Sequence, residues 1–335
     1  MLCYTATRLL YMLPVIWLVV SIVFLLIHLV PGDPIQQMLG EGATSADLQA
    51  ARHAYGLDVP IGQQYVNYWR GVLHGNLGQS LRYNRSVASL IWDRYPFTAG
   101  LTFAGLAVAL ALSIPAGVRS ARRRNRWDDR VISFVSLLGL SFPNFALAPI
   151  LILFFSIFLG VLPVSGAGTW KPLLGTHLPF PFDRLAWLRH LPFPYDRQAW
   201  LSLVLPAITL GGSLAAILTR MVRTSMLEEL GQDYIRTARA KGLPERTVVY
   251  RHALRNAMIP VLTVVGLQFG ALLAGAIVTE TIFSWPGIGR LTIQAISNRD
   301  YYLVEGCILA IGLTYVGVNF LTDLLYSVAN PRIRQ

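Results

Sequence analysis

A long apolar stretch near the N-terminus decides the fold: residues 9–30 read LLYMLPVIWLVVSIVFLLIHLV. The stretch contains no Asp, Glu, Lys or Arg, and its length matches the roughly 20 residues that a helix needs to cross a bilayer. It is longer than the ~7–15-residue apolar core of a secretory signal, and no cleavage site of small residues follows it. We therefore expect a membrane-spanning helix here.

Five further apolar runs without charged residues repeat this pattern. They cover residues 97–118, 131–161, 201–219, 257–279 and 306–322. The run 131–161 is longer than one crossing requires and contains Pro143 and Pro149, which interrupt helices, so we expect a single span with a broken or interfacial end. The sequence thus predicts an all-α integral membrane protein with six transmembrane helices.

The composition agrees with this prediction. Of the 335 residues, 54% are hydrophobic and only 13% are charged, whereas soluble domains carry roughly 25% charged residues. The two cysteines, Cys3 and Cys307, are far apart and form neither a C-x-x-C motif nor a disulfide framework. We interpret them as ordinary small apolar residues.

The basic residues indicate the orientation of the chain. Lys and Arg number 28 against 17 Asp and Glu, for a net charge of +11, and they crowd segments 119–130, 220–255 and 332–334, after the second, fourth and sixth spans. By the positive-inside rule these segments and both termini are expected in the cytosol. No aromatic interleaving or nucleic-acid motif accompanies the charges, so no nucleic-acid partner is expected.

The segment 32–96 is expected to be helical and to lie outside the cytosol. Thr44 and Ser45 suit the start of a short helix that ends near Gly56, and Pro60 precedes a second helix that runs to Leu73. We expect the pair to act as a scaffold on the membrane surface or as a cover over the pore. The predicted organisation is a first helix over 1–31, this helical segment over 32–96, and a five-helix core over 97–330.

A short tandem repeat lies between the third and fourth spans. Residues 177–188 recur with few changes as residues 190–201. His177 and His190 lack the clustered ligands that a metal site needs, so no metal site is expected. We interpret the repeat as a duplicated loop segment.

The segment 220–256 is expected to form a helix, a turn and a helix in the cytosol. Ser225 and Glu228 have the spacing of a capping box. Asp233 is a suitable cap for a short helix that follows. We expect this loop to be presented to another protein.

The short helix is expected over residues 234–241. Gly242 would end it in a left-handed conformation, and Pro244 is suited to begin the next helix. The small side chains of Ala238 and Ala240 would allow a partner backbone to come close. The surrounding cations suit an acidic or mixed rim on that partner.

Residues 233–243 read DYIRTARAKGL, and this stretch resembles the cytoplasmic loop of ABC-importer permeases. The consensus of that loop is Glu-Ala-Ala, three residues and Gly; Ala238 and Gly242 match it, whereas Arg236 replaces the glutamate. This departure is typical of the peptide-importer branch, for which the whole string is a signature. The resemblance implies that the loop couples transport to a partner ATPase, through Glu228, Gly231, Asp233, Tyr234, Ala238, Ala240 and Gly242.

The resemblance extends over nearly the whole chain. It is carried by LVPGDP at 29–34, YGLDVP at 55–60, HGNLG at 74–78, LPVSG at 162–166, TETIFSWPGIGR at 279–290 and NPRIR at 330–334. Together these stretches are similar to the B-type subunit of the dipeptide, oligopeptide and nickel permease group, with dipeptide permeases the most similar. The resemblance implies the type I ABC importer fold, the bacterial inner membrane, and three kinds of partner: a second, C-type permease subunit, two cytosolic ATPase subunits, and a periplasmic peptide-binding protein.

Missing motifs narrow the function further. The sequence has no G-x-x-x-x-G-K-[ST] phosphate loop, so ATP and Mg are expected on partner subunits, and no cofactor or catalytic residue is expected in this chain. Neither H-E-x-x-H nor G-x-S-x-G occurs, which argues against a membrane protease or lipase. Ionisable residues are almost absent from the spans, with His28 and Asp323 near span ends, so no proton relay is evident.

The expected function is therefore a permease subunit that moves dipeptides or short peptides across the inner membrane by ATP-driven import. The same machinery for nickel, glutathione or haem is an alternative, and a self-sufficient secondary transporter or channel is an alternative of another class. Polar residues of the spans are candidate pore-lining groups, although each is equally suited to helix packing. They are Ser141, Asn144, Thr209, Ser213, Thr263, Gln268 and Asn319.

Overall fold

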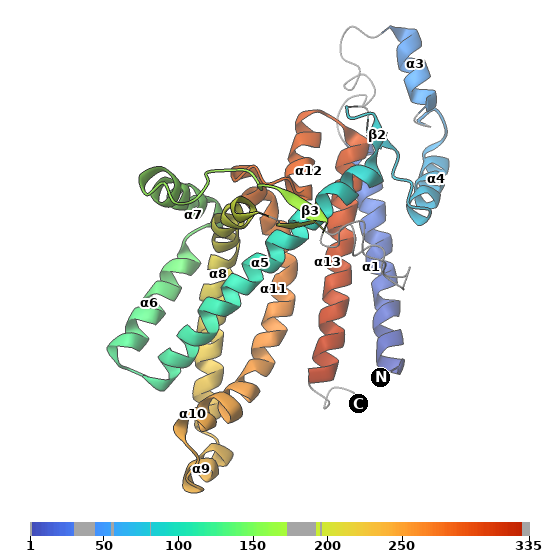
Figure 1. Ribbon diagram of the computed structural model, residues 1–335. Helices are drawn as coiled ribbons and strands as arrows, with labels where there is room; N and C mark the ends of the chain where they lie inside the picture. The colour runs from blue at the N-terminus through green and yellow to red at the C-terminus, as the bar shows by residue number, and fades with distance from the viewer. Residues whose placement is uncertain are drawn as a thin grey trace, which may run out of the picture. The chain divides into compact units, whose positions relative to one another are not determined.

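The computed structural model describes residues 2–29, 44–54, 57–80, 82–172, 192–194 and 196–329 (Figure 1). The chain folds into two compact units, and each is considered by itself. The first comprises Met1–Pro96 and Pro286–Phe320, and the second comprises Phe97–Trp285 and Leu321–Gln335.

Five helical segments of the described chain are long and apolar enough to cross a membrane. They are Arg8–Leu25, Val87–Arg122, Arg197–Leu230, Glu245–Gly270 and Tyr301–Leu324. A sixth span results if the bent pair Trp127–Ser141 and Phe145–Phe158, which meet at 112°, is one crossing. The break expected in the third apolar run lies at Phe142, whose extended backbone is the conformation favoured before a proline.

The first unit is built mainly from helices. Its elements are α1 (Leu2–Leu29), α3 (Ser45–Ala54), α4 (Ile61–Leu73), the antiparallel strands β1 (Gln79–Ser80) and β2 (Arg85–Ser86), the start of α5 (Val87–Arg122), α12 (Ile288–Ser297) and most of α13 (Tyr301–Ala329). One core cluster joins α1 to α13 through Val20, Val23 and Leu309, and a second joins α5, α12 and α13 around Val87 and Leu303.

Helices α3 and α4 begin where the sequence predicts. The Thr44 hydroxyl accepts a hydrogen bond from the Asp47 amide at 3.2 Å, while the Asp47 carboxylate accepts one from the Thr44 amide at 3.0 Å. These reciprocal bonds form a capping box at the start of α3. Pro60 precedes α4, and Gly75 and Gly78 adopt positive φ in the turn that follows.

The second unit is organised around one long, buried helix. Its elements are the rest of α5, α6 (Trp127–Ser141), α7 (Asn144–Leu151), η1 (Ile152–Phe158), the paired strands β3 (Trp170–Pro172) and β4 (Pro192–Pro194), α8 (Arg197–Leu230), α9 (Asp233–Ala240), α10 (Glu245–Thr247), η3 (Val248–Ala253) and α11 (Leu254–Ile282). Helix α8 packs against α6, α7 and α11. It also crosses α5 closely, because a Cβ on Gly211 would lie 2.3 Å from the Gly105 carbonyl oxygen.

Some local structure differs from what the apolar runs indicate. Helix α5 begins at Val87, ten residues before the apolar run at 97, because Val87, Leu90 and Ile91 form a helical apolar stripe packed in the first unit. Helix α12 forms between the fifth and sixth apolar runs, where no run indicates a helix. Two short two-stranded sheets accompany the helices, and the predicted all-α class is confirmed. His177 and His190 of the tandem repeat lie outside the described residues.

Candidate functional site

The cytoplasmic-loop candidate forms a short helix, α9, at one end of the second unit. Figure 1 shows α9 and α10 beside the ends of α8 and α11. Helix α8 continues without a break to Leu230, and the extended backbone of Gln232 sets the start of α9. Because a capping residue needs that extended conformation, Gln232 occupies the cap position and not Asp233.

Two predictions about helix ends in this loop are therefore wrong. Asp233 is the first helical residue, and its carboxylate accepts a hydrogen bond from Arg236 Nη1 at 3.2 Å. Ser225 is buried within α8, and Glu228 is an exposed residue of the same helix. Ser225 and Glu228 form no capping box, because α8 runs through both residues and no helix begins at Ser225.

The inner face of α9 packs into its own unit. Ile235 and Ala238 are buried in the core cluster that also contains Val248, Val249 and Ala253 of η3. Ala238 thus provides close packing within this chain. Tyr234 and Ala240 are exposed, as are Glu228, Gly231 and Asp233 nearby.

Tyr234 links three helices. Its hydroxyl donates a hydrogen bond to Glu229 Oε2 of α8 and accepts one from Asn256 Nδ2 of α11 at 3.0 Å. Burial, reinforced by the Glu229 carboxylate, raises the pKa of Tyr234 to about 12. The hydroxyl therefore keeps its proton at physiological pH, and the link holds there.

A second link joins α9 to α10. The Arg239 guanidinium donates from Nη2 and Nε to the two carboxylate oxygens of Glu245, at 2.9 and 3.2 Å. Such two-pronged pairs fix orientation as well as distance. Glu229, Asn256, Arg239 and Glu245 were not identified from the sequence; the i, i+6 spacing of Arg239 and Glu245 across a turn gives no helical-face signal.

Gly242 ends α9 as predicted. Its φ is +75°, in the left-handed region, and nothing lies within 4 Å of the place where a Cβ would be. The Gly242 amide donates to the Arg239 carbonyl at 2.9 Å, and the Leu243 amide reaches the Ala238 carbonyl at 3.3 Å. The requirement for glycine is therefore one of backbone conformation and not of space.

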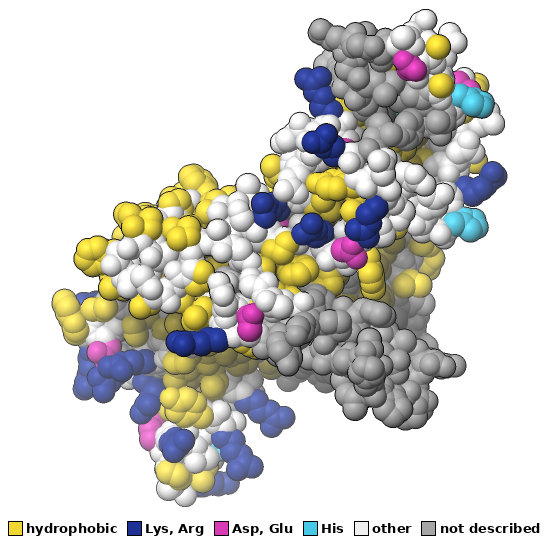
Figure 2. All heavy atoms as spheres, turned by 45° about the horizontal axis from the view of Figure 1, so that its top comes forward, with side chains coloured by type: hydrophobic (Ala, Val, Ile, Leu, Met, Phe, Trp, Pro, Cys, Tyr) yellow, Lys and Arg dark blue, Asp and Glu magenta, His cyan; other side chains and the backbone are white. Residues whose placement is uncertain are grey.

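Basic side chains gather at the same end of the second unit. A hollow of about 650 Å³ lies between the α5–α6 turn and η3. It is lined by Pro115, Arg119, Arg122, Arg123, Arg124, Arg126 and Tyr250. Figure 2 shows Lys and Arg side chains crowded at the lower left of that view. Because Tyr250 belongs to the loop segment 220–256, the structure brings two of the arginine-rich segments together.

A partly buried ion pair braces this region. Asp129 of α6 accepts hydrogen bonds from Arg223 Nε at 2.6 Å and Nη2 at 2.9 Å, although the two residues are 94 positions apart. Asp129 also accepts bonds from the Ser120 hydroxyl and the Asn125 amide. These contacts join α5, α6 and α8, and sequence spacing gave no indication of them.

The candidate pore-lining residues belong to both units. Six belong to the second unit, namely Ser141, Asn144, Thr209, Ser213, Thr263 and Gln268, and Asn319 belongs to the first. Thr209 is fully buried and its hydroxyl has no hydrogen-bond partner, while Ser141 is exposed and bonds to the Leu137 carbonyl. Their role in a pore stays a prediction. Among the described residues, no group of three or more His, Cys, Asp or Glu is placed to hold a metal ion.

These features define a polytopic helical membrane protein with a short helix held rigidly beyond its spans. The sequence model of the family "Binding-protein-dependent transport system inner membrane component" matches residues 113–335, and the model of that family's N-terminal part matches residues 1–102. The chain belongs to this family. It is a multi-pass permease subunit of an ABC importer in the inner membrane, which works with an ATPase and a binding protein.

Two relatives match this chain along its whole length. It is 45% identical over 335 residues to the di/tripeptide transport system permease protein DppB of Pseudomonas aeruginosa (strain UCBPP-PA14), covering 100% of this chain and 99% of that protein. It is 39% identical over 334 residues to the glutathione transport system permease protein GsiC of Escherichia coli (strain K12), with the same coverage. The expected resemblance to permeases of the dipeptide group is confirmed.

One solved structure supports the fold. The inward-facing MetNI methionine ABC transporter matches with a TM-score of 0.51 and 16% sequence identity, over 73% of this chain and 96% of that chain. At this identity the similarity speaks for the fold alone. It agrees with the predicted type I importer architecture.

Proposed function

We propose that this chain is the B-type permease subunit of an importer that carries dipeptides and other short peptides across the inner membrane. The observation that carries the proposal is the 45% identity to a di/tripeptide permease along the full length of both chains. The relative named for glutathione transport is less similar, and glutathione is itself a short peptide. Peptide import is therefore favoured over nickel or haem import by the same machinery.

The proposed assembly contains a second, C-type permease subunit, two cytosolic ATPase subunits and a periplasmic peptide-binding protein. ATP and Mg bind to the ATPases, and this chain contributes no catalytic residue and no cofactor site. Both termini and α9 face the cytosol. The arginines of segment 119–126 and Tyr250 of segment 220–256 line the same hollow, so these two basic segments lie on the same side of the membrane. This supports the orientation, because the positive-inside rule places each of the two segments in the cytosol.

In this mechanism the exposed side of α9 docks on an ATPase and its buried side moves the spans. Closure of the ATPase dimer displaces α9, and the contacts of Ile235, Ala238, Tyr234 and Arg239 pass the displacement to α8, α10 and α11. The spans then exchange between inward-open and outward-open states. ATP binding shifts that equilibrium only through contacts that differ between the two states.

The test is reconstitution of the affinity-purified assembly into proteoliposomes with its binding protein. We expect a radiolabelled dipeptide to accumulate only with ATP, and ATP hydrolysis to rise when peptide and binding protein are both present. Uptake of nickel or haem instead of peptide would refute the substrate. Transport by this chain without any ATPase subunit would refute the importer mechanism and support a self-sufficient carrier or channel.

A further inference from the structure

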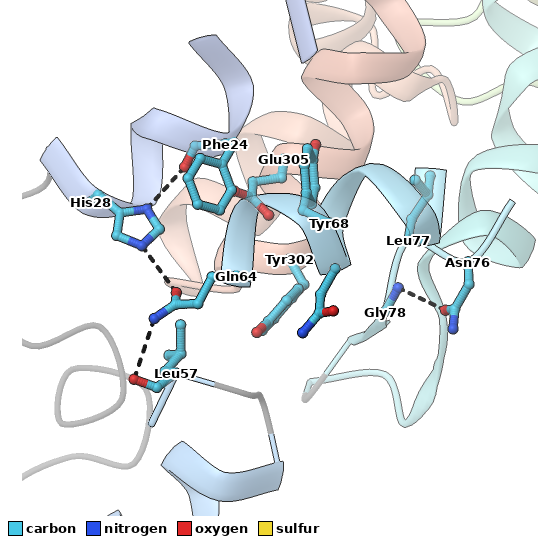
Figure 3. Close-up of a pocket in the computed structure, with 12 residues that line it drawn as sticks. Phe24, His28, Leu57, Gln64, Tyr68, Asn76, Leu77, Gly78, Tyr302 and Glu305 are labelled. Atoms are coloured by element: carbon cyan, nitrogen blue, oxygen red, sulfur yellow. Dashed lines mark hydrogen bonds between the residues drawn. The ribbon is translucent and has the colours of Figure 1, made fainter. Parts of the chain in front are cut away.

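The first unit contains a cavity of about 230 Å³ between the end of α1, helix α4 and the first turns of α13. Figure 3 shows its lining, in which Phe24 comes from α1, Tyr68 from α4, and Tyr302 and Glu305 from α13. At ~30 Å³ for each molecule of liquid water, this space corresponds to about eight waters. It is large enough for one end of a small organic ligand.

Glu305 is the unusual residue of this cavity. Its side chain is 95% buried, since only 5% remains exposed, and Figure 3 shows its carboxylate among Phe24, Tyr68 and Tyr302. Within the described part of the chain it makes no hydrogen bond and no ion pair. Acidic side chains are rarely buried without a partner, because removal from water is costly unless the lost interactions are replaced. Glu305 therefore calls for a partner beyond the described residues of this unit.

Tyr68 provides a second polar group that needs a partner. Its hydroxyl is buried and has no hydrogen bond. Burial, together with the negative charge of Glu305, holds the pKa of the Tyr68 hydroxyl well above its usual range. The phenol thus stays protonated, and its oxygen is free to accept a hydrogen bond while its proton is free to be donated.

Gln64 and His28, two other polar groups of the cavity, are already engaged. Gln64 Nε2 donates to the Val59 carbonyl at 2.7 Å, and Gln64 Oε1 faces His28 Nε2 at 3.1 Å. The second ring nitrogen of His28 meets the Phe24 carbonyl at 3.1 Å (Figure 3). His28 is therefore held at the rim, and among the described residues no Lys or Arg lines the cavity.

The chemistry of this lining selects a cation with hydrogen-bond donors. A primary ammonium group has three donors, which match the Glu305 carboxylate and the Tyr68 oxygen and leave one for water or Asn67. The rings of Phe24, Tyr68 and Tyr302 add the aromatic surroundings that attract cations. A divalent metal is disfavoured, because Ca²⁺ takes about six to eight oxygen ligands and the cavity offers one carboxylate.

We propose that this cavity is a binding site for a primary ammonium group, with the N-terminal ammonium of a short peptide as its occupant. The choice of a peptide rests on the proposed function, whereas the choice of an ammonium group rests only on the lining. Glu305 pairs with the charge, Tyr68 orients it, and the aromatic rings exclude water around it. The pattern of apolar runs does not indicate this site, because Glu305 lies one residue before the charge-free run 306–322.

The experiment uses the whole assembly in nanodiscs and two matched ligands, glycylglycine and N-acetylglycylglycine, which lacks the ammonium group. The variants are Glu305→Gln, which keeps the shape and removes the charge, and Tyr68→Phe, which removes only the hydroxyl. Asp93→Asn is the control, because Asp93 is an exposed acid of the same unit that pairs with Arg85. Methylammonium binding, followed by thermal stabilisation of the assembly without ATP, gives a readout that does not depend on transport.

We expect Glu305→Gln to weaken methylammonium binding and to raise the KM for glycylglycine by about tenfold or more, as for loss of a hydrogen bond to a charged group. Tyr68→Phe should raise the same KM by about threefold to tenfold. Neither change should affect N-acetylglycylglycine, and Asp93→Asn should behave as wild type. If Glu305→Gln does not assemble, Tyr68→Phe and wild-type methylammonium binding decide the result.

The outcomes separate this inference from the proposed function. The ammonium site is overturned if wild type and variants transport glycylglycine and N-acetylglycylglycine with equal KM values and methylammonium does not stabilise the assembly. Peptide import would still stand in that case. Stabilisation by methylammonium that Glu305→Gln abolishes, in an assembly that imports no peptide, supports the site and refutes the proposed function. A wild-type cavity that never responds to amines holds water only, and the inference fails.

Discussion

Replacement of Gly242 by valine isolates the backbone conformation that ends α9. Gly242 has a φ of +75° and open space around its Cβ position, so the side chain itself meets no obstacle. The cost is conformational, about 1–2 kcal/mol for an L-residue in the left-handed region, and valine is among the residues that resist it most. A cost of that size changes a conformational equilibrium by roughly 5–30-fold.

Because the turn at Gly242 holds α9 between α8 and α10, the valine variant should loosen the helix without unfolding the subunit. We expect the number of peptides imported per ATP hydrolysed to fall by about fivefold or more. The assay is simultaneous measurement of uptake and phosphate release in proteoliposomes. Co-purification of all subunits must first show that assembly is normal.

The matched control is Gly242→Asn, because asparagine tolerates the left-handed conformation while adding comparable bulk. It should keep most of the coupling. Equal loss in both variants would show that bulk at the ATPase contact matters and not backbone strain. Near-normal uptake by an assembled Gly242→Val complex would refute the idea that this turn transmits movement.

Three further changes probe contacts around the same loop. Asp129→Asn leaves the partly exposed Arg223 charge without its partner, so we expect about 1–3 kcal/mol of destabilisation and a lower melting temperature of the assembly, measured in detergent. Ala238→Asp buries a carboxylate in the core cluster and should reduce the yield of assembled complex, whereas Ala238→Ser should be tolerated. Tyr234→Phe removes the bond to Glu229 and should weaken coupling by an amount that does not change from pH 6 to pH 9, since the pKa of Tyr234 is raised to about 12; a strong pH dependence would contradict this.

The membrane-spanning part of the fold was predictable because the bilayer imposes a length and a composition on each crossing. The break in the third span was also predictable, since Pro143 disfavours helical backbone at Phe142. The start of α5 was missed because Asp93 and Arg94 end the apolar run, although the helix continues through them. Its apolar stripe beginning at Val87 follows helical periodicity and was the signal available.

The candidate site was predictable only in outline. The small residues and Gly242 indicated a short helix with a left-handed end, which the structure confirms at Gly242. The hydrogen bonds and ion pairs that connect this region were not predictable, because Asn256 is 22 positions from Tyr234 and Arg223 is 94 positions from Asp129. Local patterns report helix ends and faces, whereas such pairs exist only after the spans pack. Likewise, Glu305 is one acid at the edge of an apolar run until α4 and α13 enclose it.

The positions of these ties bear on how α9 can act. A helix of eight residues that was attached only through its two turns would absorb a push by rotating, and little movement would reach the spans. Tyr234 and Arg239 instead bind α9 to three neighbouring helices, while Ile235 and Ala238 fill the space against η3. The Asp129–Arg223 pair stiffens α8 against α6 a short distance before α9 begins. A displacement of α9 must therefore move the neighbouring ends of α8 and α11 together, which is the movement that the proposed alternating access requires.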